Sequence, residues 1–392
     1  MSAVRLTPIV IAPGPVGAHT AVTALRTALA GGAPIALLPS SAQATPSAGT
    51  LVAVGQPVAA ATAVVLLTGG STGQQRAVEL SGPALTAAAL AVRTALGGPG
   101  QWVCALPVVH IAGLMTLVRA IVDGTEPLVA PTTGRFDQAA MTGLVRTLAQ
   151  AAESGPARVS LVAEQARRLL AAGYAPALRG CDAVLLGGGA IPPALREALT
   201  AEGIRVRTTY GMTETCGGIV WDGRALPGYQ VRIATPPVGR IEIRGPSLAT
   251  CYRYPPQTGS SPRRPDAAAT RPCAGPDGWW LTPDIGTITD GLLSVLGRAD
   301  DLVKVDGVLV SPAAVTVLLQ QQPGVSDAQA QLDTSDLLRP VIAAEVVGEF
   351  DDAALRAAVH ARLGAAAVPR RISRVATIER DAMGKAAPVA VP

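Results

Sequence analysis

The chain has 392 residues, of which 49% are hydrophobic and 15% are charged, which is enough for two domains with sizeable cores. Its formal net charge is only +4 and its arginines are scattered along the chain, so the sequence argues against a nucleic-acid-binding protein. Five cysteines without metal-ligand spacing favour reduced, buried thiols and a cytoplasmic location.

The N-terminus lacks the continuous apolar run and cleavage site of a signal peptide, so we expect none. The most apolar long run, residues 103–122, is interrupted by Pro107, His110 and Arg119. We therefore expect no membrane span, because a spanning helix needs about 20 consecutive apolar residues.

Apolar runs alternate with Ala/Leu-rich segments of helical period over residues 33–211. This alternation predicts an α/β fold with parallel-rich sheets covered by helices. Three of the runs end in unusual loops, LLTGG at 66–70, LLGGG at 185–189 and TTYG at 208–211. In such folds ligands bind where loops leave the carboxyl ends of strands, so these loops are candidate site segments.

From Ile233 the pattern changes to short β-like pieces such as GRIEIRG and LLSVLGR. A Pro/Arg/Ala-rich tract at 252–278 interrupts them, and we predict that it is a disordered surface loop. After Arg298 a compact segment of helical and strand-like runs extends to the end of the sequence, which suits a small separate α+β domain. The predicted domains are therefore residues 1–298 and 299–392.

The stretch LLTGGSTGQQRAV, residues 66–78, places clustered glycines and hydroxyl residues after an apolar run. Backbone N–H groups and hydroxyls in such a loop form a concave nest suited to phosphate oxygens. The loop has no lysine, which a Walker P-loop requires, so a standard nucleoside triphosphatase is disfavoured. By itself the loop is equally well explained as a flexible turn between a strand and a helix.

Further motifs follow this loop in a specific order: LLGGGAIP, TYGMTETCGG, WWLTPDIGTITDGLLSVLGRADDLVKVDG and RDAMGKAAP. From about Val64 to the C-terminus, their sequence and spacing resemble the adenylate-forming acyl-CoA synthetase superfamily. ALPVVHIAGLMTLVRAIVDGT and GMTETCGGIVWDGRALPGYQVRI are most similar to the short actinobacterial o-succinylbenzoate:CoA ligases of menaquinone biosynthesis. The resemblance implies a small mobile C-terminal domain, ATP, Mg²⁺ and a carboxylic acid as ligands, and coenzyme A as co-substrate.

In this superfamily a carboxylate attacks the α-phosphate of ATP to give an acyl adenylate and pyrophosphate, and the thiol of coenzyme A then displaces AMP. Both reactants of the first step are anions, so cations and fixed dipoles must offset their repulsion. The resemblance assigns Lys385 to a bridge between the carboxylate and the phosphate, Thr213 to the α-phosphate and Glu214 to magnesium. Without the other motifs, Thr213 or Thr215 reads equally as the cap of a polar helix.

The resemblance also implies a nucleotide site. Arg76 stands where the usual pattern has lysine, and it keeps the positive charge and can bind phosphate through two N–H groups. Pro283 replaces the usual glycine before Asp284, whose carboxylate would accept from both ribose hydroxyls, with Arg298 as a further donor. The implied pyrophosphate-binding residues of the first loop are Thr68, Ser71, Thr72 and Gly73. The implied adenine-binding residues are Gly187, Gly188, Gly189, Ala190, Tyr210 and Gly211.

The acyl substrate is assigned to the segment around HIAG. His110 lies in an apolar stretch, where a core histidine is the ordinary interpretation, whereas the resemblance places it at the wall of the acyl pocket beside Gly113. The usual pattern has a second histidine where this chain has Val109. The Arg119 side chain either reaches the solvent at the end of its apolar helix or pairs with the substrate carboxylate that does not react.

Among 32 basic residues only Lys304 and Lys385 are lysines, and both fall within motifs. Arginine serves wherever a diffuse cation suffices, so the lysines are candidates for sites that need a compact ammonium. The resemblance places Asp300 at the hinge between the domains, with a surface turn as the alternative. It places Lys304 beside Gly307 of the loop that moves in for thioester formation, and a chance surface lysine explains Lys304 equally well.

These observations predict an ATP-dependent acyl-CoA ligase, with o-succinylbenzoate as the expected acid. Another acid–CoA ligase and an adenylation enzyme that loads a carrier protein are alternatives, and the latter needs a docking surface for its partner. A catalytically idle nucleotide-binding relative is a third alternative, and such a relative should lack Lys385 or Glu214, which are both present. A homodimer is an open option for the assembly.

Overall fold

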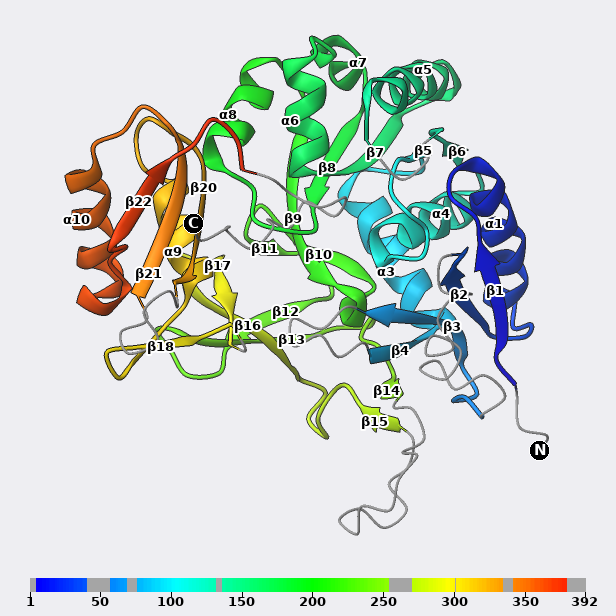
Figure 1. Cartoon of the computed structure of the whole chain (residues 1–392). Coiled ribbons are helices and arrows are strands. Elements are labelled where there is room, and N and C mark those ends of the chain that lie inside the picture. Colours follow the sequence, from blue (N-terminus) through cyan, green and yellow to red (C-terminus); the bar gives the residue numbers. More distant parts are fainter. Residues whose placement is uncertain are drawn as a thin grey trace.

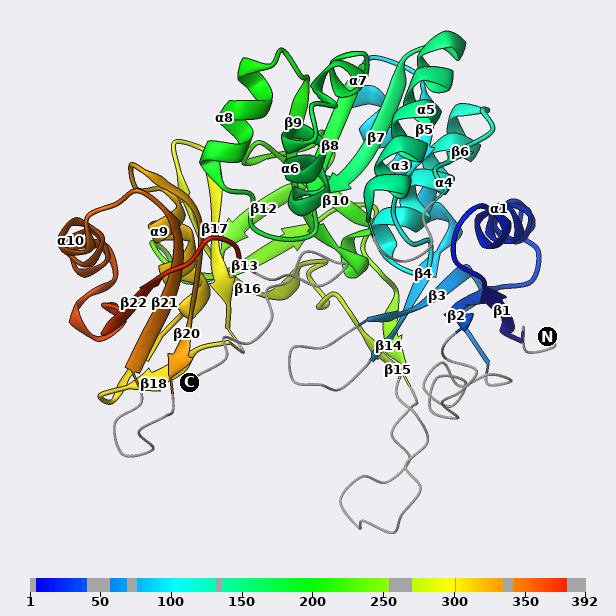
Figure 2. The ribbon, with the colours of Figure 1, turned by 45° about the horizontal axis from the view of Figure 1, so that its top comes forward.

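The structure, a computed structural model, describes residues 5–40, 57–68, 76–131, 136–253, 270–299, 301–333 and 341–378. Helices and strands alternate through most of the chain, and they form two large mixed sheets, one antiparallel sheet and a small C-terminal αβ unit (Figures 1 and 2). The α/β class predicted from the sequence is confirmed. None of the helices in the described ranges is long and apolar enough to cross a membrane.

The first sheet has the strand order β1-β2-β3-β4-β14-β15, in which β1, β2 and β3 are parallel and the later neighbours antiparallel. Its strands are β1 (Thr7–Ile11), β2 (Ile35–Pro39), β3 (Thr62–Thr68), β4 (Arg76–Ser81), β14 (Cys251–Arg253) and β15 (Thr270–Pro272). Helices α1 (Pro15–Leu29) and α3 (Gly82–Ala95) share one apolar core with this sheet.

The second sheet has the order β11-β10-β9-β8-β7-β5-β6, and its strands from β6 to β9 are parallel. The strands are β5 (Gln101–Cys104), β6 (Leu128–Val129), β7 (Ala157–Val162), β8 (Ala183–Gly187), β9 (Val206–Met212), β10 (Gly217–Trp221) and β11 (Arg224–Ala225). Side chains of α3 and α4 (Ile111–Asp123) pack on one face. The opposite face is covered by α5 (Gln138–Ser154), α6 (Ala163–Ala171), α7 (Ala175–Arg179) and α8 (Pro193–Ala201).

The antiparallel sheet follows in the chain and has the order β12-β13-β16-β17. Its strands are β12 (Gln230–Ile233), β13 (Gly239–Arg244), β16 (Trp280–Thr289) and β17 (Leu292–Arg298). Buried side chains of β13 share a core with β10, so this sheet packs beside the edge of the second sheet. The change of pattern predicted near Ile233 therefore coincides with this antiparallel sheet.

The C-terminal unit has its own core and lies beside β17, on the side of the molecule away from β1 (Figures 1 and 2). It contains the hairpin β18 (Val303–Val305) and β19 (Val308–Val310), and the sheet β20 (Val325–Asp333), β21 (Val341–Gly348) and β22 (Arg371–Arg374). Its helices are α9 (Pro312–Gln320), α10 (Asp352–Leu363) and the short η3 (Ala365–Ala367). The boundary between residues 298 and 299 stays a prediction.

Two local expectations were wrong. The loop after Thr68 joins β3 to the antiparallel strand β4, so it does not lead from a strand into a helix. Part of the predicted surface loop at 252–278 is also ordered: β14 pairs with β4, and β15 pairs with β14. Both errors arise because strand pairing depends on distant neighbours, which local composition does not reveal.

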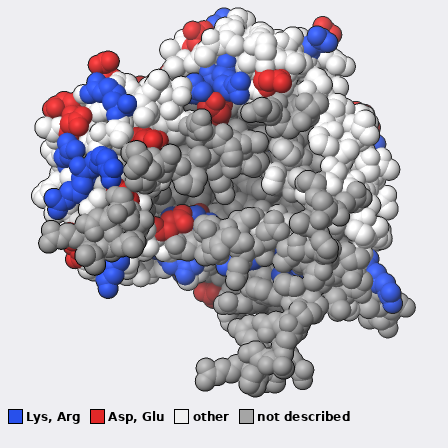
Figure 3. Space-filling view, in the orientation of Figure 1, with Lys and Arg blue, Asp and Glu red and all other residues white. Residues whose placement is uncertain are grey.

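Charges are interspersed on the surface. Basic and acidic side chains of the described residues lie side by side on the face in Figure 3, in agreement with the scattered arginines of the sequence. The cysteines also agree with expectation, because all five are free thiols. Four of them are buried, Cys104, Cys181, Cys216 and Cys251, and Cys273 is partly exposed.

The first turn of α5 offers a test of local stability. The Asp137 carboxylate accepts a hydrogen bond from the Ala140 N–H group at 3.0 Å and so caps the helix. Asp137→Ala should lower the free energy of unfolding by about 1 kcal/mol, because a backbone donor loses its partner. Denaturant titration measures this, and Asp137→Asn, which keeps an acceptor, should stay close to the parent. Equal losses in both variants would show that the cap is not the cause.

Candidate active site

The TYGMTET motif forms the end of β9 and a 3₁₀ turn, η2 (Thr213–Thr215), before the chain reverses into β10. A Cβ atom on Gly211 would lie 2.0 Å from the Gly217 carbonyl oxygen, so only glycine fits where the two strands meet. The fully buried Thr215 hydroxyl accepts from the Met212 N–H group at 2.9 Å and lies 2.8 Å from the Gly217 carbonyl. Thr215 therefore stabilises the turn, and Thr213 remains half-buried beside it.

Three residues assigned to the nucleotide meet at one place. The Tyr210 hydroxyl donates to Asp284 Oδ2 at 2.8 Å, and Asp284 pairs with Arg298 across β16 and β17. Arg298 Nη1 lies 4.0 Å from Asp284 Oδ1. Burial, together with the negative charge of Asp284, raises the pKa of Tyr210, so its hydroxyl stays a neutral donor. This arrangement fixes the Asp284 carboxylate beside a ring and a cation.

Glu214 lies in the same region and is half-buried. Burial raises the pKa of its carboxyl, whereas a hydrogen bond from Tyr252 and the charges of Arg298 and Arg76 oppose that shift. The Tyr252 hydroxyl donates to Glu214 Oε1 at 2.9 Å. Arg76 and Arg298 thus both act electrostatically on one carboxylate, although they belong to different sheets.

A desolvated carboxylate oxygen is the kind of ligand that Mg²⁺ prefers, so Glu214 fits the metal implied by the resemblance. No group of three or more potential metal-ligating His, Cys, Asp or Glu side chains occurs in the described part of the chain. A magnesium ion held by Glu214 would therefore take most of its ligands from phosphate and water, as is usual for ions that accompany nucleotides.

The predicted adenine loop leaves the carboxyl end of β8. A Cβ atom on Gly187 would lie 2.5 Å from Thr209 Oγ1 of the neighbouring strand β9, which excludes a side chain. Gly188 adopts a φ of +84°. Gly188, Gly189 and Ala190 are exposed, and no atom lies within 4 Å of a Cβ built on Gly189. The loop therefore leaves open backbone at the carboxyl end of β8, next to the strand that carries Tyr210.

His110 is exposed and directly precedes α4, so the ordinary interpretation as a core histidine is wrong. Gly113 allows the first turn of α4 to approach the preceding loop, because a Cβ there would lie 2.3 Å from the Pro107 carbonyl oxygen. Close packing therefore explains why a glycine occupies position 113. The exposure of His110 is compatible with a place at a pocket wall.

Arg119 is only 6% exposed, so its side chain does not extend to the solvent at the end of α4. Its guanidinium lies over the Trp102 ring at 5.1 Å, and Nη1 is 3.3 Å from Ser160 Oγ. Nε is buried without a hydrogen-bond partner among the described residues. Burial lowers the pKa of Arg119 to about 10, against the opposing charge of Asp123, so the group remains charged at neutral pH.

Some of the remaining predicted residues lie in the described part of the chain and others lie outside it. Thr68 and Arg76 are cross-strand partners at the ends of β3 and β4, and the Thr68 hydroxyl donates to the Arg76 carbonyl at 3.2 Å. Lys304 is exposed on β18, and Gly307, with a φ of +83°, lies in the turn to β19. The predicted residues outside the described ranges are Ser71, Thr72, Gly73, Asp300 and Lys385.

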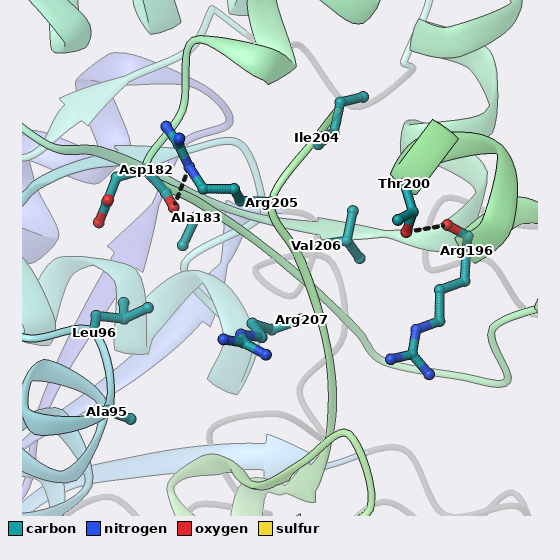
Figure 4. Close-up of a pocket in the computed structure, with 10 residues that line it drawn as sticks. All are labelled: Ala95, Leu96, Asp182, Ala183, Arg196, Thr200, Ile204, Arg205, Val206 and Arg207. Atoms are coloured by element: carbon teal, nitrogen blue, oxygen red, sulfur yellow. Dashed lines mark hydrogen bonds between the residues drawn. The ribbon is translucent and has the colours of Figure 1, made fainter. Parts of the chain in front are cut away.

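A separate pocket of about 440 Å³ lies at the opposite, amino ends of β8 and β9 (Figure 4). Arg196 and Arg207 line it and both pair with Asp222, at 3.3 and 3.2 Å. Arg205 donates to the Cys181 carbonyl at 2.8 Å. Since its cations already have partners and it faces away from the carboxyl ends of the strands, we do not count this pocket as part of the candidate active site.

A family profile described as AMP-binding enzyme matches residues 17–253, more than half of the chain. The chain belongs to the AMP-binding enzyme family. The predicted superfamily is thereby confirmed. This AMP-binding enzyme is 39% identical over 341 residues to a probable 2-succinylbenzoate–CoA ligase of Mycobacterium tuberculosis, a match that covers 85% of this chain and 84% of the relative.

Solved structures support the fold. An O-succinylbenzoate coenzyme A synthetase of Bacillus subtilis in complex with ATP and magnesium ion matches with a TM-score of 0.62 at 20% identity, over 94% of this chain and 80% of that one. An amide bond synthetase of Marinactinospora thermotolerans matches with a TM-score of 0.71 at 20% identity, over 98% of this chain and 88% of that one. The fold of this AMP-binding enzyme thus occurs with more than one named activity.

Tyr252 and Ser247 contribute to the site but were not identified from the sequence. The Ser247 hydroxyl donates to the Thr215 carbonyl at 2.8 Å, which attaches the segment before β14 to the TYGMTET turn. The only signal for Tyr252 was weak, because tyrosine itself is enriched in strands but its neighbours in CYR are not.

Proposed function

We propose that this AMP-binding enzyme is a 2-succinylbenzoate–CoA ligase, which converts the acid into its coenzyme A thioester through an acyl adenylate in menaquinone biosynthesis. The observation that carries the proposal is that Arg298 and Arg76 both act on the Glu214 carboxylate, while Arg298 also lies 4.0 Å from Asp284, which accepts from Tyr210. The similarity to the Mycobacterium tuberculosis relative supports the choice of acid. Five free thiols support a cytoplasmic setting for the reaction.

In the first step an oxygen of the substrate carboxylate attacks the α-phosphorus of ATP, and the bond to the bridging oxygen breaks, so that pyrophosphate leaves. The Asp284 carboxylate accepts hydrogen bonds from the ribose hydroxyls, and Tyr210 lies against the adenine, which orients the α-phosphate for attack. Arg76 faces the phosphates and Thr213 donates to the α-phosphate. Glu214 would hold magnesium, which would supply positive charge to the phosphates. Lys385 bridges the two reacting anions.

In the second step the sulfur of coenzyme A attacks the acyl carbon, the bond to the AMP oxygen breaks, and the thiol proton passes to solvent. We assign this step to a second arrangement of the C-terminal unit, residues 299–392, about a hinge at Asp300. In that arrangement the hairpin with Lys304 and Gly307 replaces Lys385 at the adenylate. Lys304 is exposed and no atom lies within 4 Å of a Cβ built on Gly307, which suits a hairpin that binds at the adenylate and then moves away.

Isotope exchange between pyrophosphate and ATP tests the first step without coenzyme A. We expect exchange that depends on both 2-succinylbenzoate and Mg²⁺. Absence of acid-dependent exchange would favour an idle nucleotide-binding relative. Exchange without thioester formation on addition of coenzyme A would favour the enzyme that loads a carrier protein.

A further inference from the structure

The segment from Ser247 to Tyr252 contacts the TYGMTET turn at three points. Ser247 Oγ donates to the Thr215 carbonyl at 2.8 Å, and the Ala249 N–H group donates to the Glu214 carbonyl at 2.8 Å. The third contact runs from the Tyr252 hydroxyl to Glu214 Oε1 at 2.9 Å. The first two hold the backbone of the turn, and only the third acts on the carboxylate.

We propose that Tyr252 is a positioning residue that holds the Glu214 carboxylate in the orientation needed to bind Mg²⁺ together with ATP. The inference rests on the proposed function, since it assigns Glu214 to the metal. A hydrogen bond to Oε1 restricts rotation of the carboxylate, which would hold the metal. Partners that orient a metal ligand in this way commonly contribute about 10- to 100-fold to metal affinity.

Tyr252 is itself well anchored. It lies on β14, between β4 and β15, and its neighbour Arg253 forms a buried ion pair with Glu79 of β4. The Glu79 carboxylate also accepts from the Thr62 hydroxyl at 2.7 Å. Because this pair is almost fully buried and hydrogen-bonded, β14 is fixed to the first sheet, and the Tyr252 hydroxyl is fixed with it.

The same ring links Glu214 to the predicted phosphate loop. The Arg76 guanidinium lies 5.9 Å from the centroid of the Tyr252 ring. Arg76 is the first residue after the loop, so Tyr252 lies between the cation assigned to phosphate and the carboxylate assigned to magnesium. A tyrosine hydroxyl suits this place because it donates a hydrogen bond without a charge that would compete with the metal.

The test is the Mg²⁺ dependence of ATP binding, measured by titration calorimetry on the full-length chain. Tyr252→Phe should bind ATP without Mg²⁺ as the parent does, and should need about tenfold more Mg²⁺ to reach the tighter affinity. Tyr174→Phe is the control, because its hydroxyl bonds Gln138 at 2.8 Å, away from the site. That variant should show the parent's Mg²⁺ dependence.

A double variant separates positioning from general damage. If Tyr252 acts through Glu214, Tyr252→Phe should cause no further loss in a Glu214→Gln background, since coupled residues are not additive. Unchanged Mg²⁺ dependence in Tyr252→Phe, or additive losses in the double variant, would overturn the inference. Failure of the parent to bind ATP at all would instead refute the proposed function.

Discussion

Lys385→Ala should reduce the rate of pyrophosphate release by about 10²- to 10³-fold while the dissociation constant for ATP stays near that of the parent. The lysine is assigned to charge that develops as the carboxylate attacks the phosphate, so its loss affects the transition state more than the bound nucleotide. Lys385 lies outside the described residues, and the expectation rests on the DAMGK motif and on this chemistry. Rapid-quench measurement of pyrophosphate, with calorimetry for ATP, gives both quantities.

The second half-reaction supplies the internal control. Thioester formation from chemically prepared acyl adenylate should survive in Lys385→Ala, because that step no longer joins two anions. Arg362→Ala, which removes an exposed cation at the end of α10, should leave both steps unchanged. Pyrophosphate release within about threefold of the parent would contradict the role of Lys385.

Arg119→Leu should reduce kcat/KM for 2-succinylbenzoate by about 10- to 150-fold while a monocarboxylate analogue of the same shape is nearly unaffected. Arg119 is a buried cation whose Nε lacks a partner among the described residues, and Ser160 and Trp102 are uncharged. The charge of Asp123 acts on Arg119, but that carboxylate also pairs with Arg158 and Arg93. A charge in such a place is costly unless an anion pairs with it, and the second carboxylate of the substrate would be that anion.

The comparison between the two acids shows whether Arg119 binds the second carboxylate or only stabilises the fold. Arg179→Leu is a suitable control, because Arg179 is an exposed cation on α7 that pairs with Glu202 at 3.0 Å and shares no partner with Arg119. We expect it to change neither substrate's kcat/KM. Equal losses for both acids in Arg119→Leu, with a lowered melting temperature, would mean that Arg119 only supports the core around Trp102.

The sequence predicted the α/β class, because this class depends on local signals. Glycine-rich loops at the ends of apolar runs marked the carboxyl ends of β8 and β9, where Gly187 and Gly211 leave no room for a side chain. The hydrogen bond between Tyr210 and Asp284 was not predicted, since no local pattern reports that β9 and β16 meet.

The errors have the same physical origin. The loop after Thr68 leads to a strand because β4 pairs with β3 on one side and with β14 on the other, and β14 lies far along the chain. Tyr252 was overlooked because it begins a tract whose composition is typical of loops, yet β14 is held by the buried pair of Arg253 and Glu79. The exposure of His110 likewise depends on packing around α4, which its apolar neighbours do not reveal.

Mass spectrometry of the products formed from ATP, coenzyme A and a panel of aromatic and aliphatic acids tests the central proposal most directly. We predict equal amounts of AMP, pyrophosphate and the coenzyme A thioester of 2-succinylbenzoate, with little thioester from simple benzoic or fatty acids. Preference for those simple acids, or release of ADP and phosphate in place of AMP and pyrophosphate, would contradict it.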